Sequence, residues 1–153
     1  MKDQTENIRS FFARQRAYLR HAAMAEPLVD ILMPTYRPRA EHLRTAIESV
    51  LAQGESRWRL TIRDEPTDVD TKAIVEPYGN DCRIRLFRNE RRLGIGGNWN
   101  RCLRDTEAPY VQFLFQDDTW KPNYLASAIK ALEAHPRCGL ISLGHTYALE
   151  GET

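Results

Sequence analysis

Short apolar runs alternate with segments of helical period along the chain after Pro27, and this alternation constrains the fold more than any other feature of the sequence. The apolar runs have the length of β-strands and occupy Val29–Met33, Trp58–Ile62, Arg83–Phe87, Tyr110–Phe115 and, as a last run, Gly139–Leu143. Helices are expected between them at Arg39–Gln53, Val69–Glu76, Gly97–Asp105 and Lys121–Ala134. The pattern predicts an α/β domain with a Rossmann-like, open, mainly parallel sheet and flanking helices.

The first 26 residues are expected to form a unit of their own before a main domain at residues 27–153. Apolar side chains recur at helical spacing among several arginines from Thr5 to Ala25, which predicts an amphipathic N-terminal helix. Acidic and polar residues interrupt this pattern. We therefore expect the helix to dock on the main domain of this chain or on a partner domain rather than to bind a membrane surface.

The composition excludes several classes of protein. The chain has 153 residues, and 22 Lys plus Arg against 21 Asp plus Glu leave a formal charge of +1, which gives no field to attract nucleic acid. The apolar runs are far shorter than the roughly 20 residues that span a bilayer, and the polar start is unlike a secretory signal. We therefore expect a cytoplasmic protein, with peripheral attachment to the inner face of the membrane left open. The three cysteines are interpreted as reduced thiols.

Residues that could bind a ligand or take part in catalysis follow the ends of four predicted strands. In an open parallel sheet the carboxyl ends of the strands lie along one edge, so the loops that follow them meet in one crevice. These loops are Pro34-Thr35-Tyr36, Asp64-Glu65, Asn89 to Gly97, and Gln116-Asp117-Asp118. The sequence therefore predicts a single binding site.

Asp117 and Asp118 form an acidic pair after a strand that we expect to be buried on both faces. Adjacent carboxylates repel each other unless a cation joins them. A small set of oxygen ligands suits Mg²⁺ or Mn²⁺, which usually complete their coordination with phosphate oxygens, so the pair points to a nucleoside diphosphate. A turn that caps the next helix explains the same two residues and, taken alone, is the favoured interpretation.

The other loops admit two interpretations each. Asp64 can accept a hydrogen bond from a ribose or a base, or it can belong to a turn. Tyr36 can stack on a base, or it can be an ordinary loop tyrosine. The glycines of Gly94–Gly97 can bring backbone N–H groups to a phosphate or can allow a tight loop, and Trp99 stands where a dinucleotide fingerprint needs its third glycine.

Taken together, five segments resemble the donor half of family 2 glycosyltransferases. They are Val29–Tyr36, Ala46–Gln53, Asp64-Glu65, Gly97–Cys102 and Gln116–Asp118. The resemblance runs over residues 28–143 and implies a truncated GT-A fold. It also implies a nucleotide-sugar donor, Mn²⁺ or Mg²⁺ as cofactor, and inverting transfer to a sugar, lipid or protein acceptor in cell-envelope or polysaccharide biosynthesis.

The resemblance implies roles for individual residues. It assigns the donor nucleotide to Pro34, Thr35, Tyr36, Asp64, Asn98, Arg101 and Asp117, and the metal to Asp118 with Asp117. Asp64 is assigned to the base edge, where a carboxylate can accept the imide N–H of uracil or thymine. Cytosine has no such proton, so a UDP- or dTDP-sugar is favoured, while guanine keeps a comparable N–H and is not excluded.

The chain also departs from the family pattern. Arg37 replaces a frequent asparagine, Glu65-Pro66 replaces an acid followed by glycine, and Gln116 stands where an acid is frequent. Family members continue with an acceptor-binding half that supplies the catalytic base, so no base is assigned here and a further domain or partner is expected at the open edge. The alternative is a non-catalytic nucleotide-binding or scaffolding fragment. A phosphoacceptor receiver domain ranks lower, because it needs acids after the first strand.

Overall fold

The computed structural model describes residues 26–144 and residue 146. Within them, four parallel strands form one sheet in the order β3-β2-β1-β4. The strands are β1 (Val29–Thr35), β2 (Trp58–Asp64), β3 (Ile84–Arg88) and β4 (Tyr110–Phe113). The expected open parallel α/β fold is confirmed, and the expected N-terminal helix lies outside the described residues.

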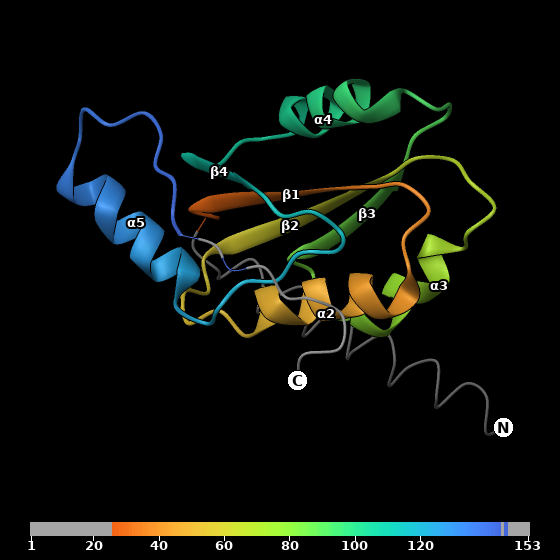
Figure 1. Ribbon diagram of the computed structural model, residues 1–153, viewed down its shortest axis with the longest axis horizontal. Coiled ribbons are helices and arrows are strands. Elements are labelled where there is room, and N and C mark those ends of the chain that lie inside the picture. The colour runs from red at the N-terminus through yellow and green to blue at the C-terminus, as the bar shows by residue number, and fades with distance from the viewer. Residues whose placement is uncertain (1–25, 145, 147–153) are drawn as a thin grey trace, which may run out of the picture.

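Helices cover both faces of the sheet. They are α2 (Ala40–Leu51), α3 (Thr71–Val75) with the 3₁₀ turn η1 (Glu76–Tyr78), α4 (Gly94–Arg104) and α5 (Tyr124–Ala134). Helix α4 lies on one face of the sheet, whereas α2 and α3 lie on the other (Figure 1). Each connection between consecutive strands of the chain carries a helix, because parallel strands cannot be joined by a tight hairpin.

The hydrophobic core lies between the sheet and α2. Alternate residues of the two central strands point to this side, and the buried face of α2 packs with them; the set is Val29, Ile31, Met33, Leu43, Ala46, Ile47, Val50, Trp58, Leu60 and Ile62. Every residue of β1 and β2 is buried. Burial of each large apolar side chain contributes about 1.5–3 kcal/mol, so this layer holds the two central strands in register.

The α4 side of the two central strands carries charged groups. Arg59 donates from Nε and Nη2 to the two oxygens of Asp30, at 2.8 and 3.0 Å. Asp30 also accepts the backbone N–H groups of Glu107 and Ala108 at 2.7 and 2.9 Å. Although burial alone would raise the pKa of Asp30, these hydrogen bonds lower it below its usual value. Asp30 thus fixes the chain between α4 and β4.

Helices α4 and α5 begin three residues away from the starts that the sequence predicts. Helix α4 begins at Gly94 rather than near Gly97, and Glu65 accepts hydrogen bonds at this end of the helix. Helix α5 begins at Tyr124 rather than at Lys121. The Gln53 side chain donates to the Lys121 carbonyl at 2.8 Å and accepts from the Leu125 N–H at 3.0 Å, so it anchors this start from outside the helix.

The expectation that the strand before the acidic pair is buried on both faces is wrong. β4 forms an edge of the described sheet, and Val111 is 41% exposed. The strand ends at Phe113, although Leu114 still donates its N–H to the carbonyl of Leu32 at 3.0 Å. The apolar run Gly139–Leu143 forms no strand, and Leu140 is 80% exposed. Because no further strand lies beside β4 in the described residues, Val111 stays exposed.

The remaining sequence expectations concern thiols and membrane spans. Cys82, Cys102 and Cys138 are free, as expected, and burial raises the pKa of the Cys102 thiol to about 11. Among the described residues we find no helix that is both long and apolar enough to cross a bilayer.

Candidate functional site

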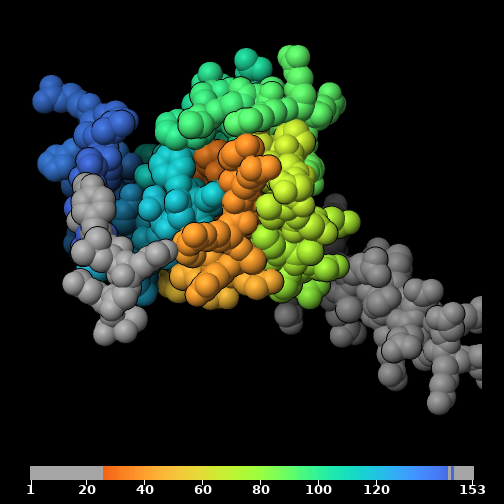
Figure 2. All heavy atoms as spheres, turned by 45° about the vertical axis from the view of Figure 1, so that its right-hand side comes forward, coloured from red at the N-terminus to blue at the C-terminus, as the bar shows by residue number. Residues whose placement is uncertain are grey.

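A cavity of about 400 Å³ lies at the carboxyl end of the sheet, beside the start of α4. Figure 2 shows the loops after β1, β2 and β4 side by side, with the first residues of α4 above them. Residues of all four predicted loops line the cavity; they are Pro34, Thr35, Tyr36, Glu65, Arg92, Gly94, Ile95, Asn98, Trp99, Phe115, Gln116 and Asp117. The prediction that the four loops meet in one crevice is confirmed.

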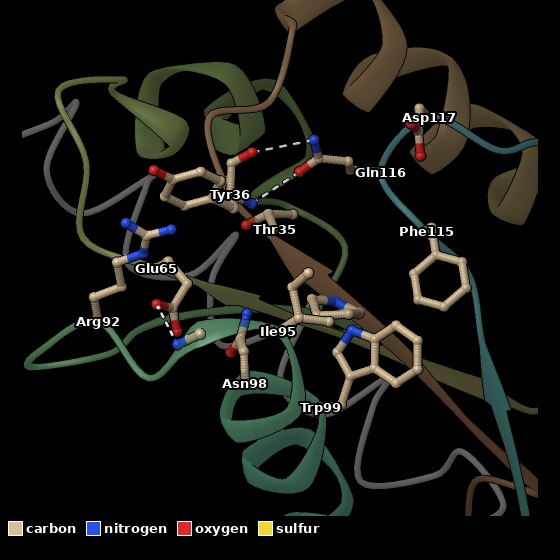
Figure 3. A pocket seen from close by; sticks show the side chains of 12 residues that line it. Thr35, Tyr36, Glu65, Arg92, Ile95, Asn98, Trp99, Phe115, Gln116 and Asp117 are labelled. Atoms are coloured by element: carbon tan, nitrogen blue, oxygen red, sulfur yellow. Dashed lines mark hydrogen bonds between the residues drawn. The ribbon is translucent and has the colours of Figure 1, made fainter.

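Tyr36 and Gln116 join the loops after β1 and β4 (Figure 3). The Tyr36 N–H donates to Gln116 Oε1 at 2.9 Å, and Gln116 Nε2 donates to the Tyr36 carbonyl at 3.2 Å. A carboxylate can accept but cannot donate, so only an amide makes both bonds. The glutamine at this position, where the family often has an acid, therefore has a clear structural role.

Thr35 and Asp64 lie together beneath the cavity. The Thr35 hydroxyl donates to Asp64 Oδ1 at 2.8 Å, and Asp64 is 2% exposed. Burial raises the pKa of the Asp64 carboxyl, an effect that its hydrogen bonds and the nearby Arg88 only partly offset. Thr35 lines the cavity and Asp64 does not, so the carboxylate reaches the cavity wall through the threonine.

Glu65 is a cavity residue to which the sequence analysis assigns no role. It is 2% exposed, and its Oε1 accepts from Asn89 Nδ2 at 2.9 Å. Its Oε2 accepts hydrogen bonds from the N–H groups of Leu93 and Gly94 at 2.8 and 3.3 Å. At this end of α4 a negative charge also interacts favourably with the helix dipole. These two N–H groups already have an acceptor. The sequence does carry a signal for this role of Glu65. Successive side chains of a strand point to opposite faces, so Glu65 points away from the side on which Asp64 lies.

Asn98 and Arg101 both lie on α4 but differ in position. Asn98 lines the cavity and is 3% exposed; it donates to the Arg63 carbonyl at 3.0 Å and accepts from Asn89 at 2.9 Å. Arg101 does not line the cavity, and its guanidinium lies 3.7 Å from the carboxylate of Asp105. Among the nucleotide-binding residues predicted from the sequence, Arg101 and Asp64 are therefore the two outside the lining.

The acidic pair lies at the β4 end of the site. Asp117 lines the cavity, Asp118 does not, and both residues are exposed. Partial burial and then the charge of Asp117 raise the pKa of Asp118. Neither carboxylate forms an ion pair with a residue that the structure describes. Two carboxylates without such a partner suit a divalent cation whose other ligands come from a bound phosphate, although the described residues contain no group of three or more acidic, histidine or cysteine side chains placed to hold a metal ion.

Two arginines lie close to the ring of Tyr36, which is 39% exposed. The guanidinium of Arg92 is 4.5 Å from the ring centroid and that of Arg37 is 5.9 Å from it. Arg37 also forms an exposed ion pair with Asp68 at 3.3 Å, and its backbone has φ 45°. Arg37 thus occupies a left-handed conformation that favours glycine or asparagine, the residue that the family often has there.

Comparisons with known proteins are consistent with this geometry. The sequence profile described as "Glycosyl transferase family 2" matches residues 30–146. The Escherichia coli enzyme UDP-Glc:alpha-D-GlcNAc-diphosphoundecaprenol beta-1,3-glucosyltransferase WfgD is 34% identical over 110 residues, which are 71% of this chain and 42% of that protein. This chain thus spans less than half the length of that relative.

Two solved structures share the fold. S. aureus TarS 1-349 in complex with UDP-GlcNAc has a TM-score of 0.65 at 22% identity, over 71% of this chain and 32% of that one. The mannosyltransferase PcManGT from Pyrobaculum calidifontis in complex with GDP-Man and Mn²⁺ has a TM-score of 0.63 at 21% identity, over 71% and 33% of the two chains. The likeness to these structures concerns the fold. With the matching profile and the related sequence, it confirms the resemblance seen in the motifs: the chain belongs to glycosyl transferase family 2.

Proposed function

We propose that this chain is the donor-binding part of a glycosyltransferase that holds a nucleoside diphosphate sugar in the cavity for inverting transfer to an acceptor. The observation that supports the proposal most is the cavity itself, which brings the Tyr36 loop and Asp117 to one site at the carboxyl ends of the strands. This is where open α/β sheets bind ligands. The nucleotide sugars in the two similar structures, UDP-GlcNAc and GDP-Man, support the same class of donor.

The proposal assigns the nucleotide to the loop after β1. Pro34, Thr35 and Tyr36 line the cavity, and the buried Asp64 carboxylate fixes the Thr35 hydroxyl at its wall. Asn98 holds α4 against β2, so that the opposite wall of the cavity keeps its position. A uracil or thymine base remains the favoured one, with the buried Asp64 carboxylate acting at the cavity wall through the Thr35 hydroxyl.

The proposal assigns a Mn²⁺ or Mg²⁺ ion to Asp118 with Asp117. When bound, such an ion supplies Lewis-acid stabilisation of the charge that develops on the leaving diphosphate. The two carboxylates themselves attract the cation and orient it toward a phosphate at the cavity. Mn²⁺ in the similar mannosyltransferase structure supports this assignment.

The acceptor side of the site is proposed to lie outside this chain. An exposed apolar face runs from α4 to β4, formed by Ile95, Trp99, Leu103, Val111 and the partly buried Phe113 and Phe115. The rings of Trp99 and Phe115 are 5.0 Å apart, and both side chains also line the cavity. Apolar surface of this kind is usually covered by further chain or by a partner. No residue of this chain is assigned as the base that deprotonates the acceptor.

A thermal-shift experiment with UDP, in the presence and absence of Mn²⁺, tests the proposal. A ligand at 100 times its dissociation constant adds about 2.7 kcal/mol to the free energy of unfolding. We expect UDP to stabilise the protein more with Mn²⁺ than without it. The variant Asp118→Asn should lose that difference, and Glu133→Gln on α5 serves as the matched acidic control. Equal metal-dependent stabilisation of Asp118→Asn and the unaltered chain would remove the acidic pair from the site.

A further inference from the structure

The segment that carries the acidic pair is held at both ends by glutamine side chains. At its beginning, Gln116 exchanges two hydrogen bonds with the backbone of Tyr36, at 2.9 and 3.2 Å (Figure 3). At its end, Gln53 donates from Nε2 to the carbonyl of Lys121 at 2.8 Å. Only residues 117–120 lie between these two attachments. A segment held at both ends over so few residues has little conformational entropy left to lose when a ligand binds.

Gln53 uses both N–H groups and the oxygen of its side-chain amide in this region. Its Nε2 also donates to the Ser49 carbonyl at 3.0 Å, and its Oε1 accepts the Leu125 N–H at 3.0 Å. Gln53 is 8% exposed and lies just after α2, 68 residues before Lys121 in the chain. A carboxylate in its place could keep only the bond from Leu125, and an apolar side chain could keep none of the three.

Two neighbouring contacts strengthen the same attachment. The Gly54 N–H donates to the Pro122 carbonyl at 3.0 Å. The ring of Trp120 stacks on that of Tyr124 with 4.6 Å between centroids, and both rings pack against the hydrophobic core. The end of the acidic segment is thus attached to α2 and to the core, whereas the two carboxylates before it are exposed. The attachment therefore acts on the carboxylates through the backbone.

A divalent cation requires its carboxylate ligands in a definite arrangement. This step rests on the proposed function, which assigns the cation to Asp118 with Asp117. Mg²⁺ demands near-ideal octahedral geometry, and replacing the groups that orient metal ligands typically lowers metal affinity 10- to 100-fold. Gln53 does not line the cavity, so it contributes to the site through the position of this segment.

We propose that Gln53 is a positioning residue for the metal-binding acidic pair. Through the Lys121 carbonyl it fixes the end of residues 117–120, so that the two carboxylates are held ready for a cation beside the Tyr36 loop. The role concerns the metal rather than the nucleoside, because the attachment to the Tyr36 loop is made by Gln116.

Calorimetric titration of the full chain with UDP, in Mn²⁺ and in EDTA, tests this role, and the ratio of the two UDP affinities is the readout. Gln53→Met keeps the length of the side chain and removes all three hydrogen bonds, so the ratio should fall roughly 10-fold while the affinity in EDTA is unchanged. Gln53→Glu keeps the acceptor for the start of α5 and removes the donors. It should lower the ratio similarly, and it replaces the methionine variant if that variant does not fold.

The chain offers a matched control in Gln112 on β4. This glutamine is also partly shielded from solvent, donates to the adjacent Phe113 carbonyl at 3.0 Å and does not line the cavity. Gln112→Met should leave the affinity ratio unchanged. A fall equal to that of Gln53→Met would contradict a specific role for Gln53.

Urea denaturation of the same variants separates positioning from folding. A merely structural role would lower the free energy of unfolding and leave the affinity ratio unchanged, and this result would overturn the inference. Equal losses of UDP affinity in Mn²⁺ and in EDTA would overturn it too. In both cases a loss of the Mn²⁺ effect in Asp118→Asn would still support the proposed function. An unaltered chain whose UDP affinity does not respond to Mn²⁺ would overturn the metal assignment together with this inference.

Discussion

The hydroxyl of Thr35 donates a 2.8 Å hydrogen bond to the carboxylate of Asp64, and this bond joins the last residues of β1 and β2. The two residues are direct partners in the register of the sheet, and they are 1% and 2% exposed. Because Tyr36 follows Thr35 at once, this buried contact determines where the wall of the cavity begins.

Replacement of Thr35 by valine keeps the shape of the side chain and removes the donor. The buried carboxylate of Asp64 then loses the hydrogen bond from Thr35, so the free energy of unfolding should fall by about 1–3 kcal/mol. Urea denaturation measures the loss. Thr35→Ser retains the hydroxyl and should lose less; a serine variant as unstable as the valine variant would show that the methyl group, and not the hydrogen bond, matters.

The Asp64 carboxyl also gives the stability of the protein a particular pH dependence. Burial raises its pKa above 3.8, so in the folded state it still binds a proton at pH values where the unfolded chain has lost it. Its contribution to stability therefore falls as the pH rises from the unfolded pKa through the raised folded pKa, and is constant above that. Urea denaturation between about pH 4 and about pH 7 should show this fall to be smaller in Asp64→Asn.

The same variant tests whether Asp64 contributes to base recognition. Asp64→Asn removes the charged acceptor that holds the Thr35 hydroxyl at the cavity wall, so we expect UDP to bind about 1–3 kcal/mol more weakly while the effect of Mn²⁺ persists. Calorimetric titration of UDP with and without Mn²⁺ measures both quantities. Unchanged UDP affinity would remove Asp64 from the base site.

Removing one partner of the buried ion pair between Asp30 and Arg59 should strongly lower the free energy of unfolding. Asp30→Ala leaves the Arg59 guanidinium, 10% exposed, without its main partner, and the free energy of unfolding should fall by about 3–5 kcal/mol. Glu107→Gln removes the other, 78% exposed partner of Arg59 and should cost under about 1 kcal/mol. Urea denaturation compares the two variants, and similar losses would contradict the dominance of the buried partner.

Arg37 should be replaceable with a gain in stability. Its φ of 45° is unfavourable for arginine and acceptable for asparagine, so Arg37→Asn should raise the free energy of unfolding by about 1 kcal/mol. Asp68→Asn removes only the exposed ion pair with Arg37 and controls for its loss. Thermal denaturation measures both, and a destabilised Arg37→Asn would show that the ion pair and the ring contact outweigh the backbone strain.

The exposed face of α4 and β4 should make the isolated chain associate. Val111 is 41% exposed on a strand with an unpaired edge in the described sheet, and such edges pair with other chains. Val111→Lys places a charge there and should shift the sedimentation profile toward monomer. Thr106→Lys, in the loop before β4, controls for the added charge; an equal effect of both would point to net charge rather than to the edge.

The sequence by itself determined the kinds of elements, their order and the loops that carry the site. These features are local, because strands and helices differ in the period of their apolar residues, and parallel strands place successive loops at one edge. The Asp64-Glu65 pair, the Tyr36 loop and the acidic pair could all be assigned to one crevice on that basis.

Only the tertiary structure decided which member of each pair faces the cavity and which groups fix the element ends. Glu65 rather than Asp64 lines the site because the strand continues two residues further than the apolar run Trp58–Ile62 indicates. Glu65 accepts N–H groups at the start of α4 from 28 residues earlier in the chain, and Gln53 reaches α5 across 72 residues. Such contacts join residues far apart in sequence, so no local period predicts them. The exposure of β4 has the same origin, because the neighbours of a strand depend on the topology of the whole sheet.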